Sequence, residues 1–152
     1  MGDRQFMAMA LREAKQALLE GEIPIGAVVV FEGTVIAAAH NEREAREDAA
    51  AHAEMLAIEK AVRRLGRRRL TGCTLYVTIE PCPMCAGAIL NARADRLVYG
   101  APNEEAGCID SVYPICREGI LDHRPRIRSG ILKEACRKMM DDFFKEKRDR
   151  IS

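Results

Sequence analysis

The sequence predicts an α/β protein, a three-layer α/β/α sandwich with a mixed central sheet of about five strands. Three observations favour this fold class. Apolar residues recur at helical spacing in separate segments along the chain. Short β-branched runs lie between those segments. After an initial hairpin, strands and helices alternate, so the later strands should run parallel with helices on both faces of the sheet.

The N-terminal part predicts a helix followed by a hairpin. Apolar residues recur every three or four positions over 4–20, and Gly21 is suited to end that helix. Residues 23–31 form an apolar, β-branched run, and a Glu32-Gly33 turn leads into 34–39. We expect both strands of this hairpin to be buried.

The middle of the chain predicts alternating helices and strands. The charged segment 41–51 has no apolar period, so we expect a loop that leads into a helix over 52–65. Residues 75–79 predict a strand, and the prolines behind it can stop the strand and open a helix over 83–90. Residues 96–100 predict another strand.

Secondary structure in the C-terminal part is harder to predict, except in its last segment. Over 101–129 there are turn signals, Gly119 among them, and a short strand is expected around Ile127. Residues 131–144 carry a broad apolar stripe that predicts a closing helix, and charged residues follow over 145–150. That stripe could cover the core or form a subunit interface.

Length and composition narrow the class of protein. A chain of 152 residues suits a single domain over 1–152, and 48% hydrophobic with 31% charged residues is unlike disordered chains. The longest apolar stretch, at nine residues, is far below the roughly 20 needed to cross a bilayer. Lys and Arg total 24 against 23 Asp and Glu, so attraction to nucleic acid must come from local clusters. Six irregularly spaced cysteines and no secretory signal pattern favour the cytoplasm.

His52, Cys82 and Cys85 carry the metal chemistry that the sequence predicts. One imidazole and two thiolates are a three-ligand set for Zn²⁺, which leaves a fourth tetrahedral position for water. Cys82 should cap the helix that starts at Pro83, where the helix dipole favours thiolates. Residues two apart point to opposite sides of a helix, so His52 and Glu54 must lie at a helix start to face one site.

Glu54 is expected beside the metal without being a ligand. There it can act as general base, taking a proton from the zinc-bound water and later giving it to a leaving nitrogen. Zinc lowers the pKa of that water from about 15.7 to near 7, so hydroxide is available at neutral pH. A C-x-x-C pair alone could be a redox pair or half of a structural zinc site. H-x-E followed by P-C-x-x-C, however, is the pattern of zinc nucleobase deaminases, so the sequence predicts hydrolytic deamination.

Longer motifs flank the metal pattern. They are EIPIGA at 22–27, Asn41, AHAE at 51–54, TLYVTIEPC at 74–82, MCAGA at 84–88 and DFF at 142–144. Together they resemble the bacterial tRNA-specific adenosine deaminases over about 6–148, nearly the whole chain. The shorter metal pattern is shared with cytidine, deoxycytidylate and guanine deaminases. The resemblance implies a cytidine deaminase-like fold. It also implies conversion of adenosine to inosine at the wobble position of a tRNA anticodon, that of an arginine tRNA. The enzyme would be a homodimer with one Zn²⁺ per subunit.

The resemblance also implies contacts with the tRNA anticodon loop. In the family, a residue matching Asn41 hydrogen-bonds the flipped nucleoside, the backbone matching Ala53 meets the base, and a residue matching Ile25 helps to wall the pocket. Phe143 and Phe144 lie on the closing helix, which in the family touches the anticodon loop. From the residues alone, Asn41 could instead cap a turn and Ile25 could belong to the core.

The chain departs from the family pattern at three places, one of which is Asp110-Ser111, where relatives have a small Gly-Ser pair. Ala49-Ala50 stand where proline-threonine is frequent, so the loop before His52 should be less rigid. Asn103 stands where many relatives have aspartate. An amide in place of a carboxylate removes repulsion toward a phosphate backbone, so we expect a shifted tolerance for the substrate backbone, RNA or DNA.

Two other functions stay open at this point. The same zinc chemistry could act on free guanine, cytosine or a nucleoside. A non-catalytic RNA-binding module with a structural zinc is the second alternative, although a structural site is normally closed by a fourth protein ligand. A basic cluster could contact phosphates or simply complement a helix end; it comprises Arg63, Arg64, Arg67, Arg68 and Arg69.

Overall fold

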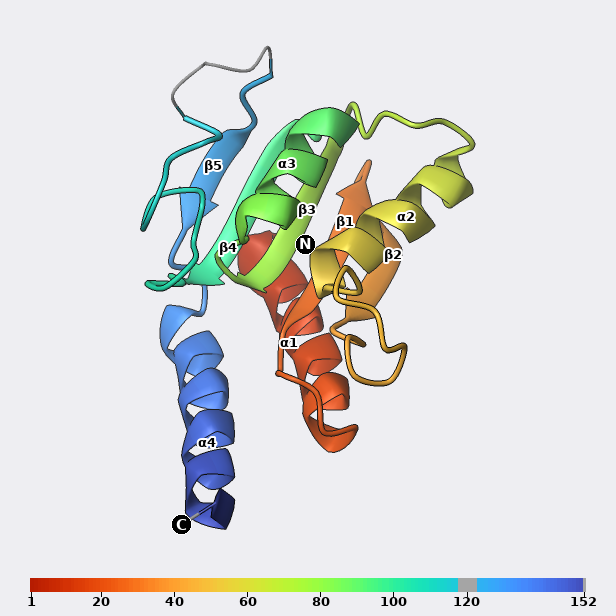
Figure 1. Cartoon of the computed structure of the whole chain (residues 1–152). Coiled ribbons are helices and arrows are strands. Elements are labelled where there is room, and N and C mark those ends of the chain that lie inside the picture. Colours follow the sequence, from red (N-terminus) through yellow and green to blue (C-terminus); the bar gives the residue numbers. More distant parts are fainter. Residues whose placement is uncertain (118–122, 152) are drawn as a thin grey trace.

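The computed structural model describes residues 1–117 and 123–151, and its elements follow the predicted order (Figure 1). The helices are α1 (Asp3–Leu19), α2 (Ala53–Leu65), α3 (Pro83–Ala92) and α4 (Lys133–Ile151). The strands are β1 (Gly26–Phe31), β2 (Thr34–His40), β3 (Cys73–Ile79), β4 (Arg96–Ala101) and β5 (Arg126–Ser129). The turn expected at Gly119 lies outside the described residues.

The strands of the described residues form one mixed sheet in the order β2-β1-β3-β4-β5. β1 is antiparallel to both β2 and β3, whereas β3, β4 and β5 run parallel. Helices α2 and α3 cover one face of the sheet, and α1 and α4 cover the other (Figure 1). The predicted three-layer α/β/α sandwich is therefore confirmed. None of the helices that the structure describes is long and apolar enough to cross a membrane.

The core consists of two apolar clusters, one on each face of the sheet. The cluster under α2 and α3 includes Val29, Leu56, Leu75, Ile89 and Leu97. The cluster under α1 and α4 includes Phe6, Met7, Val28, Tyr76 and Cys136. The consecutive residues Val28 and Val29 point to opposite faces, as expected for a strand that is buried on both sides. This is why the run in β1 is continuously apolar.

Three details differ from the sequence-based expectation. β1 begins at Gly26 and not at Ile23, because the backbone N–H of Ile25 turns back to the carbonyl of Ile23 at 2.9 Å. β2 is an edge strand and is only half buried, so the expectation of two buried strands is wrong for β2. α4 begins at Lys133 and continues through the charged residues 145–150, which are helical.

Candidate metal centre and pocket

Two helix starts meet at one end of the sheet and carry the candidate metal ligands. His52 is the N-cap of α2 and Cys82 is the N-cap of α3, both with extended backbone, and Pro83 lies in the first turn of α3. Glu54 lies in the first turn of α2, so it can face the same site as His52. Cys85 is in the first turn after Cys82, and both thiols therefore lie at the positive end of the α3 dipole.

His52, Cys82 and Cys85 form a triangle of metal-ligating atoms. Nδ1 of His52 lies 3.6 Å from Sγ of Cys82 and 3.6 Å from Sγ of Cys85, and all three ligand atoms lie within 4.8 Å of one another. In a tetrahedral zinc site with Zn–N of about 2.0 Å and Zn–S of about 2.3 Å, nitrogen and sulfur ligands are about 3.5 Å apart. The donor set and its spacing therefore fit a zinc ion. Within the described residues this group comprises just these three side chains.

The electrostatics of the two cysteines favour a shared cation. The Cys85 thiol and the His52 ring hydrogen-bond to the sulfur of Cys82, and this lowers the pKa of Cys82 to about 4 although burial opposes it. The contact with Cys82, together with burial, raises the pKa of Cys85 far above its ordinary value. One thiolate thus disfavours the second beside it, as for any close pair of like charges. A divalent cation between the sulfurs removes that repulsion, so this pair suits a metal.

Glu54 is a buried carboxyl at the wall of the pocket. It is 4% exposed, and this burial raises the pKa of Glu54 to about 7, although its own backbone N–H and the charge of His52 act in the opposite direction. A carboxyl whose pKa is near neutrality can both accept and return a proton. The position and environment of Glu54 therefore suit general acid–base chemistry next to the metal-ligand triangle.

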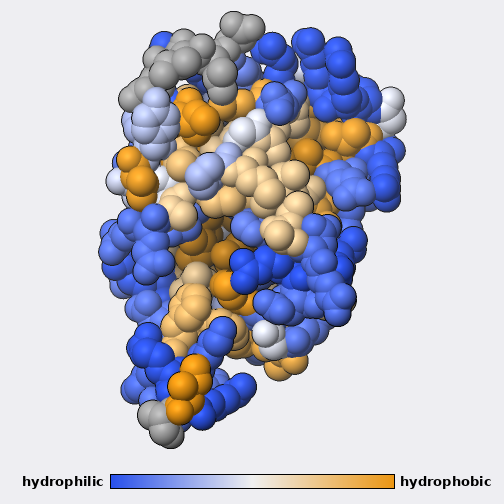
Figure 2. Space-filling view, viewed as in Figure 1, coloured by the Kyte–Doolittle hydropathy of each residue, from blue (hydrophilic) through white to orange (hydrophobic). Residues whose placement is uncertain are grey.

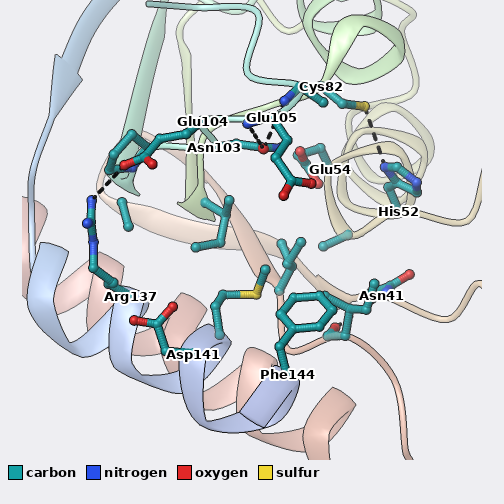
Figure 3. A pocket seen from close by; sticks show the side chains of 18 of the residues that line it. Asn41, His52, Glu54, Cys82, Asn103, Glu104, Glu105, Arg137, Asp141 and Phe144 are labelled. Carbon is teal, nitrogen blue, oxygen red and sulfur yellow. Dashed lines mark hydrogen bonds and ion pairs between the residues drawn. The ribbon is translucent and has the colours of Figure 1, made fainter. Parts of the chain in front are cut away.

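A pocket of about 680 Å³ opens beside these groups, within the range of ordinary ligand sites. Figure 2 shows hydrophobic residues set back in a hollow, with hydrophilic residues around its rim. In Figure 3, His52 and Glu54 lie on one side of the pocket, and Arg137, Asp141 and Phe144 face it from α4 on the other. The last helix therefore completes a pocket whose metal-ligating end comes from α2 and α3. Periodicity alone did not indicate Arg137 or Asp141, because they belong to the polar part of α4.

The structure brings most of the predicted substrate contacts to this pocket. Those that line it are Ile25, Asn41, Ala53, Asn103 and Phe144. Phe143 lines a neighbouring hollow of about 290 Å³ instead, and it packs edge-on against Phe144 with ring centroids 5.2 Å apart. The structure therefore assigns the two adjacent phenylalanines to different cavities, because neighbouring residues on a helix point in different directions.

Asn41 and Ile25 each have a structural contact of the kind that the sequence left open, and both also line the pocket. Oδ1 of Asn41 accepts the backbone N–H of Arg43 at 3.1 Å, and its Nδ2 donates to the carbonyl of Ile23 at 3.3 Å, while the residue also lines the pocket. Ile25 packs against both core clusters and lines the pocket as well. Ala53 is the first residue of α2, where a backbone N–H has no acceptor within the helix.

Two buried glutamates hold the loops that border the pocket, and sequence patterns did not reveal them. Glu22 is 1% exposed and accepts the backbone N–H groups of Glu44 at 3.0 Å and Ala45 at 2.8 Å. The loop before α2 is thereby anchored, although Ala49-Ala50 give it no proline before His52. Glu80 accepts N–H groups of the loop after β4, among them that of Asn103 at 3.1 Å. An acidic residue directly after the apolar run of β3 is the signal that could have revealed Glu80.

The basic cluster of residues 63–69 lies at the C-terminal end of α2, whereas the pocket lies at its N-terminal end. Arg63 pairs with Glu59 one turn earlier, at 2.7 Å. Arg67 donates to the carbonyl of Arg69 at 2.6 Å. In the described part of the chain, none of the cluster's arginines lines the pocket. These contacts favour a local role at the helix end over phosphate binding at the site.

A family model and several known proteins resemble this chain. Residues 1–101 match the cytidine and deoxycytidylate deaminase zinc-binding region. The chain is 47% identical to the tRNA-specific adenosine deaminase of Bacillus subtilis (strain 168), over 96% of this chain and 91% of that protein. A solved structure from work on A-to-I editing by tRNA:A34 deaminases matches with a TM-score of 0.86 at 41% identity, over 89% of this chain and 98% of the other. The guanine deaminase of Bacillus subtilis matches with a TM-score of 0.65 at 41% identity, over 67% and 66%.

Proposed function

Because this chain belongs to the tRNA-specific adenosine deaminases of the cytidine and deoxycytidylate deaminase family, we propose that it converts adenosine to inosine at the wobble position of a tRNA anticodon. An arginine tRNA is the substrate that we expect. The observation that carries the proposal is the triangle of His52, Cys82 and Cys85, with the buried Glu54 beside it at the wall of a pocket. The arrangement is the one that hydrolytic deamination requires.

The proposed chemistry divides the work among four side chains. Nδ1 of His52 and the two sulfurs of Cys82 and Cys85 would hold one zinc ion. When bound, zinc acts as a Lewis acid that lowers the pKa of a water from about 15.7 to about 7. A carboxylate oxygen of Glu54 takes a proton from the attacking water and returns it to the exocyclic nitrogen of adenine. The nitrogen leaves as ammonia, and the base that remains is hypoxanthine.

The lining of the pocket supports a nucleotide that is splayed out of an RNA loop. Unstacked loop bases are read by hydrogen bonds to their edges and by apolar contacts with their faces. We assign the polar contacts to Asn41 and to the backbone of Ala53, and the apolar walls to Ile25 and Phe144. Arg148 also lines the pocket and supplies positive charge for a flanking phosphate.

The direct test is inosine formation in an arginine anticodon stem-loop. We expect turnover by the zinc-loaded protein and, for the matched variant Glu54→Gln, an unchanged zinc content with turnover lower by about 10²- to 10⁴-fold. The amide keeps the shape of the carboxylate but cannot accept the proton. Equal turnover by both proteins would remove Glu54 from the mechanism. A zinc-loaded protein that forms no inosine in this stem-loop or in other anticodon loops would refute the proposed function.

One alternative has a specific observation in its favour, the match to guanine deaminase over about two thirds of each chain. In that case the pocket would take a free base. The same protein should therefore be assayed in parallel with free guanine, free cytosine and adenosine. Turnover of free guanine without turnover of the stem-loop would favour the alternative, whereas the opposite pattern supports the tRNA substrate.

We also propose that the enzyme acts in the cytoplasm as a homodimer. The outer face of α3 supports the dimer: Met84 is 36% exposed, and Gly87 and Ala88 are only partly covered, so an apolar strip is available for a second copy. The six cysteines are free thiols, which is consistent with a reducing compartment. Sedimentation velocity should show a dimer that Met84→Glu converts to monomer. A monomeric wild-type protein that is fully active would contradict the dimer.

A further inference from the structure

One wall of the pocket is a loop without helix or strand. Residues 102–106 line the pocket, and Figure 3 shows Asn103, Glu104 and Glu105 at its edge. The loop follows β4 and consists of turns as far as residue 117. Backbone N–H groups of such a segment have no ladder to pair with, so side chains or other loop carbonyls must accept their hydrogen bonds. The shape of this wall therefore depends on whichever groups accept those hydrogen bonds.

Asn103 accepts the N–H groups of Glu105 and Ala106 within the loop, whereas the main acceptor outside the loop is the carboxylate of Glu80, which the loop surrounds. Oε1 accepts the N–H of Asn103 at 3.1 Å and the hydroxyl of Ser111. Oε2 accepts the N–H groups of Ile109 at 3.1 Å, Asp110 at 2.7 Å and Ser111 at 2.9 Å. Glu80 is 2% exposed, so water cannot replace these donors without a rearrangement. The carboxylate thus joins the two ends of a single loop, Asn103 at one end and residues 109–111 at the other.

Close packing around the carboxylate leaves the loop little freedom. A Cβ on Gly107 would collide with Cδ of Glu80 and would lie 2.5 Å from the carbonyl oxygen of Asn103, so only glycine allows the loop to close here. The N–H of Glu80 donates to the carbonyl of Ala101 at 2.9 Å, and the N–H of Cys108 donates to the carbonyl of Pro81 at 2.8 Å. The loop is therefore tied both to the carboxylate and to the backbone that directly precedes Cys82.

Burial alone does not account for this arrangement. A carboxylate withdrawn from water needs hydrogen-bond partners, and the partly buried Asp3 finds them in side chains of three strands, at Tyr76, Arg96 and Arg128. Asp3 does not line the pocket within the described residues. Every group given above that donates to the Glu80 carboxylate belongs instead to the loop that forms the pocket wall. The contacts of Glu80 therefore set the distance between the wall and the metal-ligand triangle.

We propose that Glu80 is a positioning residue of this deaminase: it holds the loop 102–111 so that residues 102–106 form the substrate wall opposite α4, at a defined place relative to Cys82. The proposal rests on the proposed function and assigns a cause to the shape of the site. Loss of the contacts should weaken binding of the nucleotide in ground state and transition state alike. It should leave the metal ligands and Glu54 in place, because they are N-caps or first-turn residues of α2 and α3 and not part of the loop.

The test compares Glu80→Gln with two variants that disturb the same clamp from the loop side, Gly107→Ala and Ser111→Ala. For Glu80→Gln and Gly107→Ala we expect KM for the anticodon stem-loop to rise about tenfold or more, with kcat within about threefold of wild type and full zinc content. Ser111→Ala, which keeps the backbone donors, should have a smaller effect. Amide hydrogen exchange of residues 103–111 should accelerate in the same order. Asp3→Asn is the matched control: it lowers thermal stability and leaves KM unchanged.

Each outcome decides the inference. Wild-type KM in folded Glu80→Gln and Gly107→Ala would overturn it, and so would activity that falls only in proportion to a loss of zinc. A KM increase of the same size in Asp3→Asn would show that KM follows stability and not the clamp. If Glu80→Gln does not fold, Gly107→Ala and Ser111→Ala carry the comparison. If the wild-type protein does not deaminate the stem-loop while the exchange data follow the predicted order, the proposed function fails and the clamp stands.

Discussion

The substitution Asp3→Asn should lower the free energy of unfolding by about 3 kcal/mol at neutral pH. Oδ1 and Oδ2 of Asp3 accept Nη1 and Nη2 of Arg96 at 2.7 and 2.6 Å, and Asp3 also accepts Tyr76 Oη at 2.6 Å and Arg128 Nη1 at 2.8 Å. Breaking a buried pair costs about 3–5 kcal/mol. The lower end applies because the side chain of Arg96 is 25% exposed, and because Arg128, at 57% exposed, contributes less than about 1 kcal/mol.

The pH dependence of this effect has a defined sign. The hydrogen bonds from Arg96 hold the pKa of Asp3 well below its ordinary value, although burial opposes them. A group whose pKa is lower in the folded protein stabilises it fully above the unfolded value, near pH 4, and progressively less as the pH falls toward the folded value. The stability difference between wild type and Asp3→Asn should therefore be constant from about pH 5 to 7 and shrink below about pH 4.

Urea unfolding of both proteins at several pH values measures this difference. For a chain of this length, a loss of about 3 kcal/mol corresponds to a melting temperature lower by about 6–12 °C. Arg128→Ala, which removes the exposed partner, should change the melting temperature by no more than about 4 °C. A difference below about 1 kcal/mol at pH 7, or one that persists undiminished to pH 3, would refute the assignment of this network as a main tie between α1 and the sheet.

Three further changes test other parts of the structure. Gly26→Ala should cost about 3 kcal/mol in chemical denaturation, because its Cβ would overlap the carbonyl of Ala10 and lie 2.5 Å from the nitrogen of Ala14; an unchanged midpoint would contradict this packing of α1 on β1. Cys85→Ser should lose most of its zinc in elemental analysis, and a chelator should then lower the melting temperature of wild type alone; full zinc content would exclude Cys85 as a ligand. Asn103→Asp should change the ratio of activity on a DNA loop to activity on the matching RNA loop, because a carboxylate repels phosphate and cannot donate a hydrogen bond; equal ratios would discard the idea.

The contacts of Asn103 separate an effect of charge from a change in loop shape. Oδ1 of Asn103 accepts the N–H groups of Glu105 at 3.3 Å and Ala106 at 3.1 Å, bonds that an aspartate could accept equally well. The loop should therefore keep its turn in Asn103→Asp, and the backbone N–H of residue 103 should still donate to the carboxylate of Glu80. Any change in the preference for RNA or DNA then reports on charge at the pocket wall and not on a distorted loop.

Local chemistry explains why much of the fold was predictable. The apolar period of the first helix, the β-branched runs of β1 and β3, and Pro83 at the start of α3 each express a preference of the backbone or side chain within a few residues. The same holds for the metal pattern, because Cys82 and Cys85 are brought together by one helical turn. The predicted start of β1 was wrong because the turn at Ile23–Ile25 depends on a backbone hydrogen bond, which the pattern of apolar residues does not indicate.

Periodicity, caps and ligand spacing are local properties, and they were therefore enough to predict the order and type of the elements and the chemistry of the candidate site. Long-range packing, in contrast, places Phe144 and not Phe143 in the pocket wall and leaves β2 at the edge of the sheet. It also decided which buried carboxylates hold the loops, Glu22 and Glu80. The physical reason is that a charged side chain becomes a loop anchor only when distant backbone N–H groups reach it, and no local pattern carries that information.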